Sequence, residues 1–199
     1  MQVKLFDGSL PPASPVTLGI DQSLTGFAIS AVCVDSPEFY KTWVYTSPYK
    51  GVQRLVDIRF WMIEKFDEFW LHNNEIKDIA MEGTVRASFS ASALGELSGT
   101  VKTTIWDYFD ATYADNQHLR LPLQIPPTTV KKFAAEKGNA TKLDMLNKVR
   151  DRWNADFGKN DNAADSYAIA RMATGVSITP LEAEIIKQIK DPKYRDSSV

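Results

Sequence analysis

The stretch Val16-Thr-Leu-Gly-Ile-Asp-Gln-Ser-Leu-Thr-Gly26, followed by the apolar run Phe27–Val34, decides the fold. Apolar residues lead up to Asp21, and the small and polar residues after it predict a turn over 22–26 between two antiparallel strands. A third apolar run over 40–45 completes a predicted antiparallel meander. Asp21 is thereby placed at the end of a strand, where open α/β sheets commonly build their sites.

Helix and strand patterns alternate after this meander. Apolar residues recur at three- and four-residue spacings over 51–72, which predicts a helix, and 76–81 is an apolar run typical of a buried strand. Further along, we expect a helix over 91–112, a strand over 121–125 and helices over 128–137, 141–153 and 161–173. This order predicts an α/β fold with a five-stranded mixed sheet, its first three strands antiparallel, flanked by helices.

The two ends of the chain carry weaker patterns. Residues 1–15 contain three prolines and no clear period, so we expect a tail or a surface strap before a single domain over 16–176. Residues 177–199 are expected to form a C-terminal helix and a charged tail. The sequence Thr179-Pro-Leu-Glu182 predicts a capping box with proline in the first turn. Thr128 or Thr129 is expected to cap the helix over 128–137, and Gly138 to end it.

Composition limits the classes of protein that remain. A chain of 199 residues and 22.3 kDa is long enough for one domain with a buried core. No apolar run approaches the roughly 20 residues that span a bilayer, and no secretory signal is visible. The single cysteine, Cys33, excludes an internal disulfide framework and fits a reducing cytosol, so we expect a cytoplasmic protein.

Charge argues weakly against nucleic acid as a partner, because the net charge is −2 and the isoelectric point about 5.7. The uneven distribution of charge along the chain weakens this argument. Segment 127–160 is locally basic, with Lys131, Lys132, Lys137, Lys142, Lys148, Arg150, Arg152 and Lys159.

Four carboxylates in three separate segments carry the functional signal. Asp21 and Glu82 each end an apolar strand pattern, and Asp161 and Asp165 are four residues apart, which stacks them on one helix face roughly 5–6 Å apart. Carboxylates gathered in this way repel one another unless a cation lies between them. Oxygen ligands without a nearby cysteine or histidine cluster indicate Mg²⁺ or Mn²⁺. Two such ions about 4 Å apart would suit phosphodiester hydrolysis.

Each carboxylate also has a simpler interpretation. Asp21 could be a turn residue, and Asp161 could be the N-cap of its helix. Asp165 and Glu82 are harder to explain in this way, because an ionised carboxylate beside apolar residues is costly without a partner.

Several motifs together resemble the RuvC-type Holliday junction resolvases, which are ribonuclease H-like nucleases, and the sequence looks like a bacteriophage or otherwise divergent member. The motifs are Gly19-Ile-Asp-Gln-Ser-Leu-Thr-Gly-Phe-Ala28, Met81-Glu-Gly83, Leu94-Gly-Glu-Leu-Ser-Gly99 and Asn162-Ala-Ala-Asp-Ser-Tyr-Ala-Ile-Ala170. They occur in the family's order over about residues 16–173. The resemblance implies that Asp21, Glu82 and Asp165 bind two metal ions.

One position departs from the family's pattern. Its last motif commonly has aspartate three residues before the position of Asp165, where this chain has Asn162. Asp161 is one residue earlier on the same helical side, so we assign the fourth carboxylate to Asp161 and leave Asn162 as an alternative oxygen ligand.

The resemblance also implies DNA contacts. Val130-Lys131 and Gly138-Asn-Ala-Thr-Lys142 match the family's lysine segments, and Lys132 adds to the basic surface. A lysine beside the metals can pair with a phosphate. The loop after Glu82 supplies Arg86 and Phe89. Phe89 would insert against exposed bases, although a core position for Phe89 and solvated helix positions for the lysines remain open.

By resemblance, the chain is expected to be a homodimeric endonuclease in DNA recombination and repair that cleaves four-way junctions to 5′-phosphate and 3′-hydroxyl ends. A broader branched-DNA debranching nuclease and a catalytically inactive junction-binding protein are the alternatives. The segment Gly19–Gly26 also resembles the phosphate-binding turn of actin-like ATPases, but those need a second similar domain. Trp106 and Tyr108 could contribute to a dimer seam or to the core, and His72 and His118 are expected at the surface.

Overall fold

The computed structural model describes residues 2–83, 91–112 and 117–191. Six strands form one mixed sheet in the order β1-β4-β3-β2-β5-β6. The strands are β1 (Gln2–Gly8), β2 (Val16–Asp21), β3 (Phe27–Cys33), β4 (Tyr40–Thr46), β5 (Ile76–Glu82) and β6 (Leu123–Ile125). Strands β1 to β4 pair antiparallel, whereas β5 and β6 run parallel to β2.

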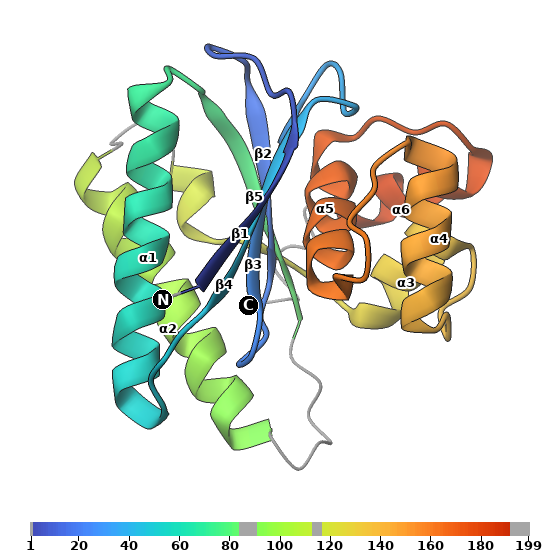
Figure 1. Ribbon diagram of the computed structural model, residues 1–199. Coiled ribbons are helices and arrows are strands. Elements are labelled where there is room, and N and C mark those ends of the chain that lie inside the picture. The colour runs from blue at the N-terminus through green and yellow to red at the C-terminus, as the bar shows by residue number, and fades with distance from the viewer. Residues whose placement is uncertain (1, 84–90, 113–116, 192–199) are drawn as a thin grey trace.

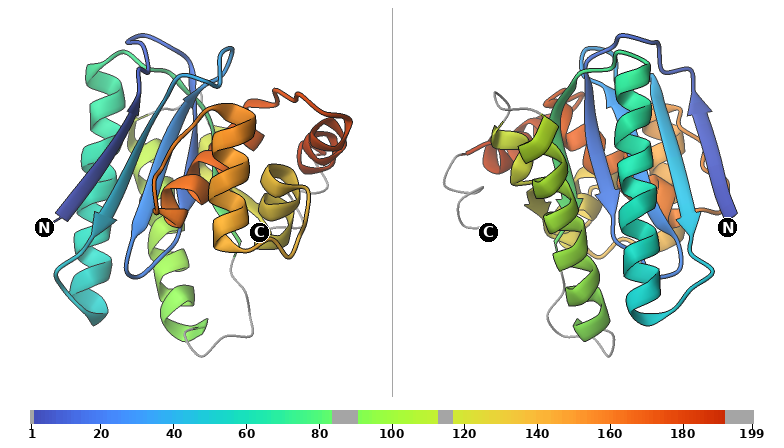
Figure 2. Two further views of the ribbon diagram at one scale, coloured as in Figure 1. Left: turned by 45° about the vertical axis from the view of Figure 1, so that its right-hand side comes forward. Right: turned by 90° about the vertical axis from the view of Figure 1, so that its left-hand side faces the viewer.

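Helices cover both faces of this sheet (Figure 1). Helices α1 (Gly51–Leu71) and α2 (Ala91–Thr112) lie on one face. On the other face lie α3 (Pro127–Ala135), α4 (Lys142–Trp153), α5 (Asp161–Thr174) and α6 (Pro180–Ile189), and a 3₁₀ turn, η1, spans Gln117–Arg120. The views in Figure 2 show α1 and α2 side by side across the first face. None of the described helices combines the length and the apolarity that crossing a membrane requires.

Alternation along the strands divides the core into two layers. Strand β2 is buried at every residue, because both of its faces are covered. Leu18 and Ile20 pack toward α1 and α2 with Phe66 and Phe109, whereas Ala28 of β3 faces the α3–α6 layer. Of the helices in that layer, α5 packs directly across β2, β3 and β5. The first residues of α5 therefore lie close to the central strands.

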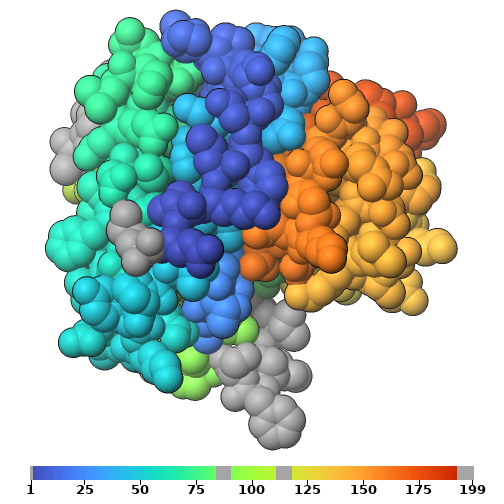
Figure 3. All heavy atoms as spheres, in the orientation of Figure 1, coloured from blue at the N-terminus to red at the C-terminus, as the bar shows by residue number. Residues whose placement is uncertain are grey.

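The prediction of an N-terminal tail over 1–15 is wrong for residues 2–8. These residues form β1, which pairs along its whole length with β4 and makes the sheet six-stranded rather than five-stranded. Figure 3 shows this strand at the surface, between α1 and the α3–α6 layer. Residues 10–15 do form a strap, and Pro11 and Ser14 both accept a hydrogen bond from the side-chain amide of Asn74 at 3.1 Å.

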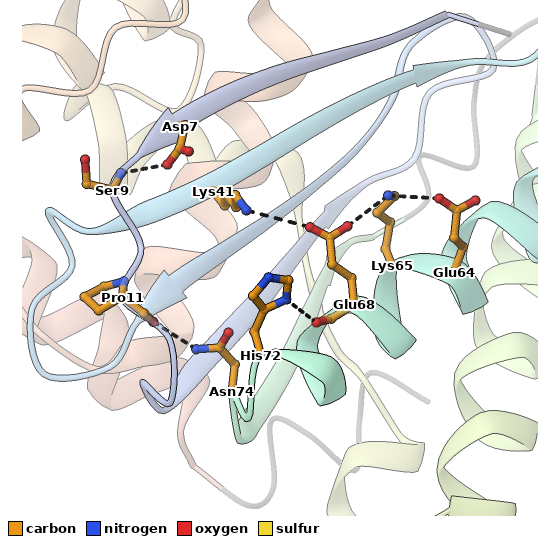
Figure 4. A network of polar contacts seen from close by, with 9 residues as sticks. All are labelled: Asp7, Ser9, Pro11, Lys41, Glu64, Lys65, Glu68, His72 and Asn74. Atoms are coloured by element: carbon orange, nitrogen blue, oxygen red, sulfur yellow. Dashed lines mark hydrogen bonds and ion pairs between the residues drawn. The ribbon is translucent and has the colours of Figure 1, made fainter.

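The opposite end of the sheet from Asp21 and Glu82 is tied together by polar contacts (Figure 4). Glu68 of α1 pairs with Lys41 of β4 at 3.7 Å and with Lys65 of its own helix at 3.0 Å. These contacts hold α1 to the antiparallel half of the sheet, together with the bond from Asn74 to the strap.

Three boundaries differ from the sequence predictions for local reasons. Helix α3 begins at Pro127 without a side-chain cap from Thr128 or Thr129, because proline already has the backbone angle of a first helical residue. Its last residue is Ala135, and the C-cap is Glu136, which has a left-handed φ of 62°, and not Gly138. The last strand starts at Leu123 and not at residue 121, and η1 precedes it over residues 117–120.

The helix caps follow the sequence more closely. Thr141 and Asp144 form a complete capping box on α4. Thr179 caps α6, but Glu182 does not complete the predicted capping box there. Its carboxylate instead accepts from the backbone of Ile178 at 2.6 Å and pairs with Arg152 at 2.5 Å.

Candidate active site

Two carboxylates meet at the ends of neighbouring parallel strands. Asp21 is the last residue of β2 and Glu82 is the last residue of β5, and the preceding residues, Ile20 and Met81, are paired in register. Strands β2 and β5 are therefore direct neighbours in the sheet. Asp21 is only 5% exposed. Its carboxyl group is within hydrogen-bonding reach of the carboxyl group of Glu82.

Helix α5 brings the other two carboxylates to the same end of the sheet. Asn160 caps the helix through the backbone N–H of Ala163 at 2.9 Å, so Asp161 is the first helical residue and not the N-cap. Asp165 follows one turn later. The close approach of α5 is permitted by Gly19, because a Cβ there would lie 2.1 Å from the carbonyl oxygen of Ser166.

Electrostatics shows that the four carboxylates act on one another. Burial raises the pKa of Asp21 well above its ordinary value, and the charges of Glu82, Asp165 and Asp161 raise it further. Burial, then the charges of Glu82 and Asp161, raise the pKa of Asp165 to about 7. Burial also raises the pKa of Glu82, although its hydrogen bond with Asp21 and the charge of Lys131 oppose this. Four like charges in one buried site are unfavourable without a cation.

The chemistry of the donors fits a hard divalent cation. All four side chains offer carboxylate oxygens, and Oδ1 of Asp165 is buried without a hydrogen-bond partner. Within the described residues, however, no three acidic, histidine or cysteine side chains are arranged to hold a metal ion as they stand. Binding a cation would therefore require these side chains to move together.

Gln22 is a site residue that the sequence reasoning missed. Its side-chain amide donates to the backbone carbonyl of Glu82 at 2.6 Å, which links the ends of β2 and β5. Its own Oε1 is buried without a hydrogen-bond partner. The residue was visible directly after Asp21 in the first motif, but no local pattern distinguishes a buried glutamine from an exposed one in a turn.

The two predicted lysines lie beside the carboxylates. Lys142, the first residue of α4, forms an ion pair with Asp161. Lys131 of α3 is near enough to Glu82 and Asp165 for its charge to lower the pKa of both. Lys132 is exposed on the same helix. The predicted DNA contacts Arg86 and Phe89 lie outside the described residues.

Asn162 faces a different neighbour from Asp161. A Cβ at Gly26 would lie 2.3 Å from the side-chain Nδ2 of Asn162, so this amide packs against the turn between β2 and β3. The charge of Asp161, by contrast, raises the pKa of both Asp21 and Asp165. Asp161, and not the amide of Asn162, therefore interacts electrostatically with the other carboxylates.

The other residues considered in the sequence analysis differ in how buried they are. Tyr108 belongs to the α1–α2 layer, where its hydroxyl donates to Asp67 at 2.8 Å. Trp106 is 45% exposed. Cys33 is buried, and both histidines, His72 and His118, are exposed as expected.

An antiparallel meander continued by two parallel strands, with a helix across the centre that brings aspartates to the strand ends, is a ribonuclease H-like architecture. Within that class the chain has the fold of the RuvC-type resolvases, as the sequence resemblance predicted. No family model and no curated protein sequence matches the chain. The fold assignment therefore rests on the structure.

Two solved structures of RuvC from Thermus thermophilus are similar to the chain at 22% sequence identity. The protein alone gives a TM-score of 0.58, covering 80% of this chain and 94% of RuvC. RuvC in complex with a Holliday junction substrate gives a TM-score of 0.59, and the match covers 80% of this chain and 97% of RuvC. The yeast mitochondrial Holliday junction resolvase Ydc2 gives a TM-score of 0.51 at 16% sequence identity, and the match covers 95% of this chain and 85% of Ydc2.

Proposed function

We propose that the chain is a divalent-metal-dependent, structure-selective endonuclease that cleaves branched DNA, with four-way junctions as its preferred substrate. The observation that carries this proposal is the meeting of Asp21, Glu82, Asp161 and Asp165 at one end of the sheet, with Oδ1 of Asp165 buried and unpaired. The fold shared with RuvC and Ydc2 supports the choice of substrate.

Each residue would have a defined role. Two Mg²⁺ or Mn²⁺ ions would activate the attacking water and stabilise the leaving oxygen, giving 5′-phosphate and 3′-hydroxyl ends. Asp21, the most buried of the four, would hold the ions together with Glu82, Asp165 and Asp161. Lys131 would stabilise charge on the scissile phosphate, because it already lies beside Glu82 and Asp165.

The proposal is tested by cleavage of end-labelled DNA with Mg²⁺, with Mn²⁺ and with a chelator. Four-way junction, replication fork and linear duplex are compared. Paired symmetric nicks in the junction alone would support a resolvase, and cuts in the fork as well would make the chain a general debranching nuclease. Tight junction binding without any cut under either metal would contradict the proposal and favour a binding protein.

Neighbouring lysines on α3 allow a matched test of the proposed DNA contacts. Lys131→Ala should slow junction cleavage by about 10-fold or more, because it removes a charge beside the carboxylates. Lys132→Ala should weaken junction binding slightly and reduce its dependence on salt, while leaving the rate at saturating DNA unchanged. Single-turnover rates and binding at several salt concentrations measure both effects. Equal rate losses in the two variants would contradict the role given to Lys131.

We also propose that the chain forms a homodimer through the exposed side of α2. Trp106 lies at a cavity of about 220 Å³ that it shares with Leu121 and Pro122, and the Arg120 guanidinium stacks 5.6 Å from its ring centre. An exposed tryptophan beside an apolar hollow is typical of interface anchors. A dimer would place two active sites on opposite strands of a junction.

Trp106→Ala should therefore convert the dimer to a monomer at micromolar concentration, as measured by light scattering after gel filtration. Trp70→Ala on α1 is the control, because Trp70 is 46% exposed and Trp106 is 45% exposed. A variant at position 106 that stays dimeric would place the seam elsewhere.

A further inference from the structure

Lys142 occupies the position of a counter-ion in the carboxylate cluster. Its ammonium forms an ion pair with Oδ2 of Asp161, which joins the first residue of α4 to the first residue of α5. The same ammonium is close enough to Asp165 and Asp21 for their charges to act on it. Three of the four carboxylates therefore share the charge of this lysine.

The two ends of this ion pair are held very differently. The side chain of Lys142 is 80% exposed, whereas that of Asp161 is 23% exposed. An ion pair whose lysine is solvated typically contributes about 0–1 kcal/mol, because solvent screens it and the lysine loses rotamer freedom on forming it. Lys142 can therefore leave Asp161 by rotating into solvent, without any movement of the helices.

The arrangement of the carboxylates is consistent with the release of Lys142 from Asp161. Among the described residues, no three acidic, histidine or cysteine side chains are placed to hold a metal ion, Asp161 is paired with Lys142, and Oδ1 of Asp165 has no hydrogen-bond partner. A cation that bound Asp161 and Asp165 together would have to displace the ammonium from Asp161. A divalent ion attracts a carboxylate more strongly than a single ammonium does.

We propose that Lys142 is an exchangeable counter-ion, which neutralises Asp161 in the metal-free chain and moves to a DNA phosphate when a divalent metal takes Asp161. This inference rests on the proposed metal site. The exchange makes metal and DNA bind cooperatively, because metal binding releases a lysine for the phosphate backbone. By linkage, junction DNA would raise the affinity for metal by the same factor.

The first test measures metal binding without DNA, by calorimetry with Mg²⁺ at low ionic strength. Lys142→Met removes the competing charge and should bind Mg²⁺ about two- to fivefold more tightly than the natural chain. Lys148→Met is the matched control on the same helix, because Lys148 pairs with Glu136 and not with the cluster. This control should leave the affinity for Mg²⁺ unchanged.

The second test measures junction affinity with a chelator and with Ca²⁺, which prefers the same oxygen ligands. Ca²⁺ should strengthen binding by the natural chain, and Lys142→Met should lose most of that gain. Unchanged or weaker Mg²⁺ binding by Lys142→Met would overturn the exchange alone. Failure of the natural chain to bind any divalent ion, with or without DNA, would overturn the proposed metal site as well.

Discussion

Asp165→Asn is expected to abolish junction cleavage while making the metal-free protein more stable. Oδ1 of Asp165 is buried without a hydrogen-bond partner, and the charges of Glu82 and Asp161 lie close to it. Asparagine keeps the shape and removes the charge. Cleavage should fall by at least about 100-fold, because the substitution removes one of the proposed metal ligands. The free energy of unfolding at pH 8 should rise by roughly 1–3 kcal/mol.

The pH dependence of stability gives a second signature of the same residue. Burial and neighbouring charges raise the pKa of Asp165 to about 7 in the folded chain, above the ordinary value of 3.8. The folded state therefore holds a proton between these values that the unfolded state has lost. The contribution of Asp165 to stability should decline as the pH rises through this window, and the decline should be smaller in Asp165→Asn.

Urea unfolding of the metal-free protein at several pH values measures this effect, with Asp35→Asn as the control. Asp35 is exposed, so its substitution should change the free energy of unfolding by less than about 0.5 kcal/mol. Mg²⁺ should stabilise the natural chain and have little effect on Asp165→Asn. A metal-free Asp165→Asn protein that is less stable than the natural chain would contradict the view that this carboxylate is kept for binding a cation.

The central strands could be predicted because their signals are local. In β2 and β5 an apolar run ends in an acidic residue, and the turn after Asp21 is made of small and polar residues. Burial on both faces makes such strands recognisable without knowledge of their partners. Parallel pairing of the two strands then brings Asp21 and Glu82 together.

Strand β1 was missed because an edge strand carries a weak pattern. Val3 and Leu5 alternate with Lys4 but are 40% and 49% exposed, and Phe6 alone packs into the core, against Phe157 at a ring distance of 5.3 Å. The partner strand β4 lies more than 30 residues away in the sequence. The prolines that follow at 11, 12 and 15 are the stronger local signal, and they correctly indicate a strap.

The details of the site depend on tertiary contacts that spacing does not contain. From the sequence alone, either Asn160 or Asp161 could cap the helix. The sequence therefore leaves open whether Asp161 is an N-cap or a metal ligand. The structure separates these roles, since Asn160 caps α5 and Asp161 pairs with Lys142. The packing of Asn162 against Gly26 and the burial of Gln22 likewise arise only once α5 and β5 lie against β2.

Gly19→Ala is expected to be among the most damaging small substitutions in the chain. A Cβ at this position would lie 2.1 Å from the carbonyl oxygen of Ser166 and 2.3 Å from the backbone nitrogen of Ala170. Both are backbone atoms of α5, so the helix itself must move away from β2. The free energy of unfolding should fall by about 3 kcal/mol or more, because overpacking at a rigid contact is not relieved by rotating a side chain.

The same movement should disable the proposed active site. Two hydrogen bonds hold α5 to the sheet, from the Thr17 hydroxyl to the carbonyl of Ala170 at 2.8 Å and between the hydroxyls of Ser30 and Ser166 at 2.8 Å. Asp165 directly precedes Ser166, so any displacement that breaks these bonds also moves Asp165 away from Asp21. Junction cleavage should therefore be lost even at temperatures at which the variant remains folded.

Gly95→Ala on α2 is the matched control, because a Cβ there meets nothing within 4 Å. Alanine in a helix interior should stabilise the chain by about 0.5–1 kcal/mol, so the two glycine substitutions should have opposite signs. Urea unfolding of both variants, followed by cleavage assays below the unfolding transition, measures stability and geometry separately. The prediction would be contradicted by a Gly19→Ala protein whose free energy of unfolding lies within 1 kcal/mol of that of the natural chain and which still cleaves junctions. Such a result would show that α5 can shift on β2 without disturbing the carboxylates. The close packing of α5 on β2 would then not be what positions Asp165.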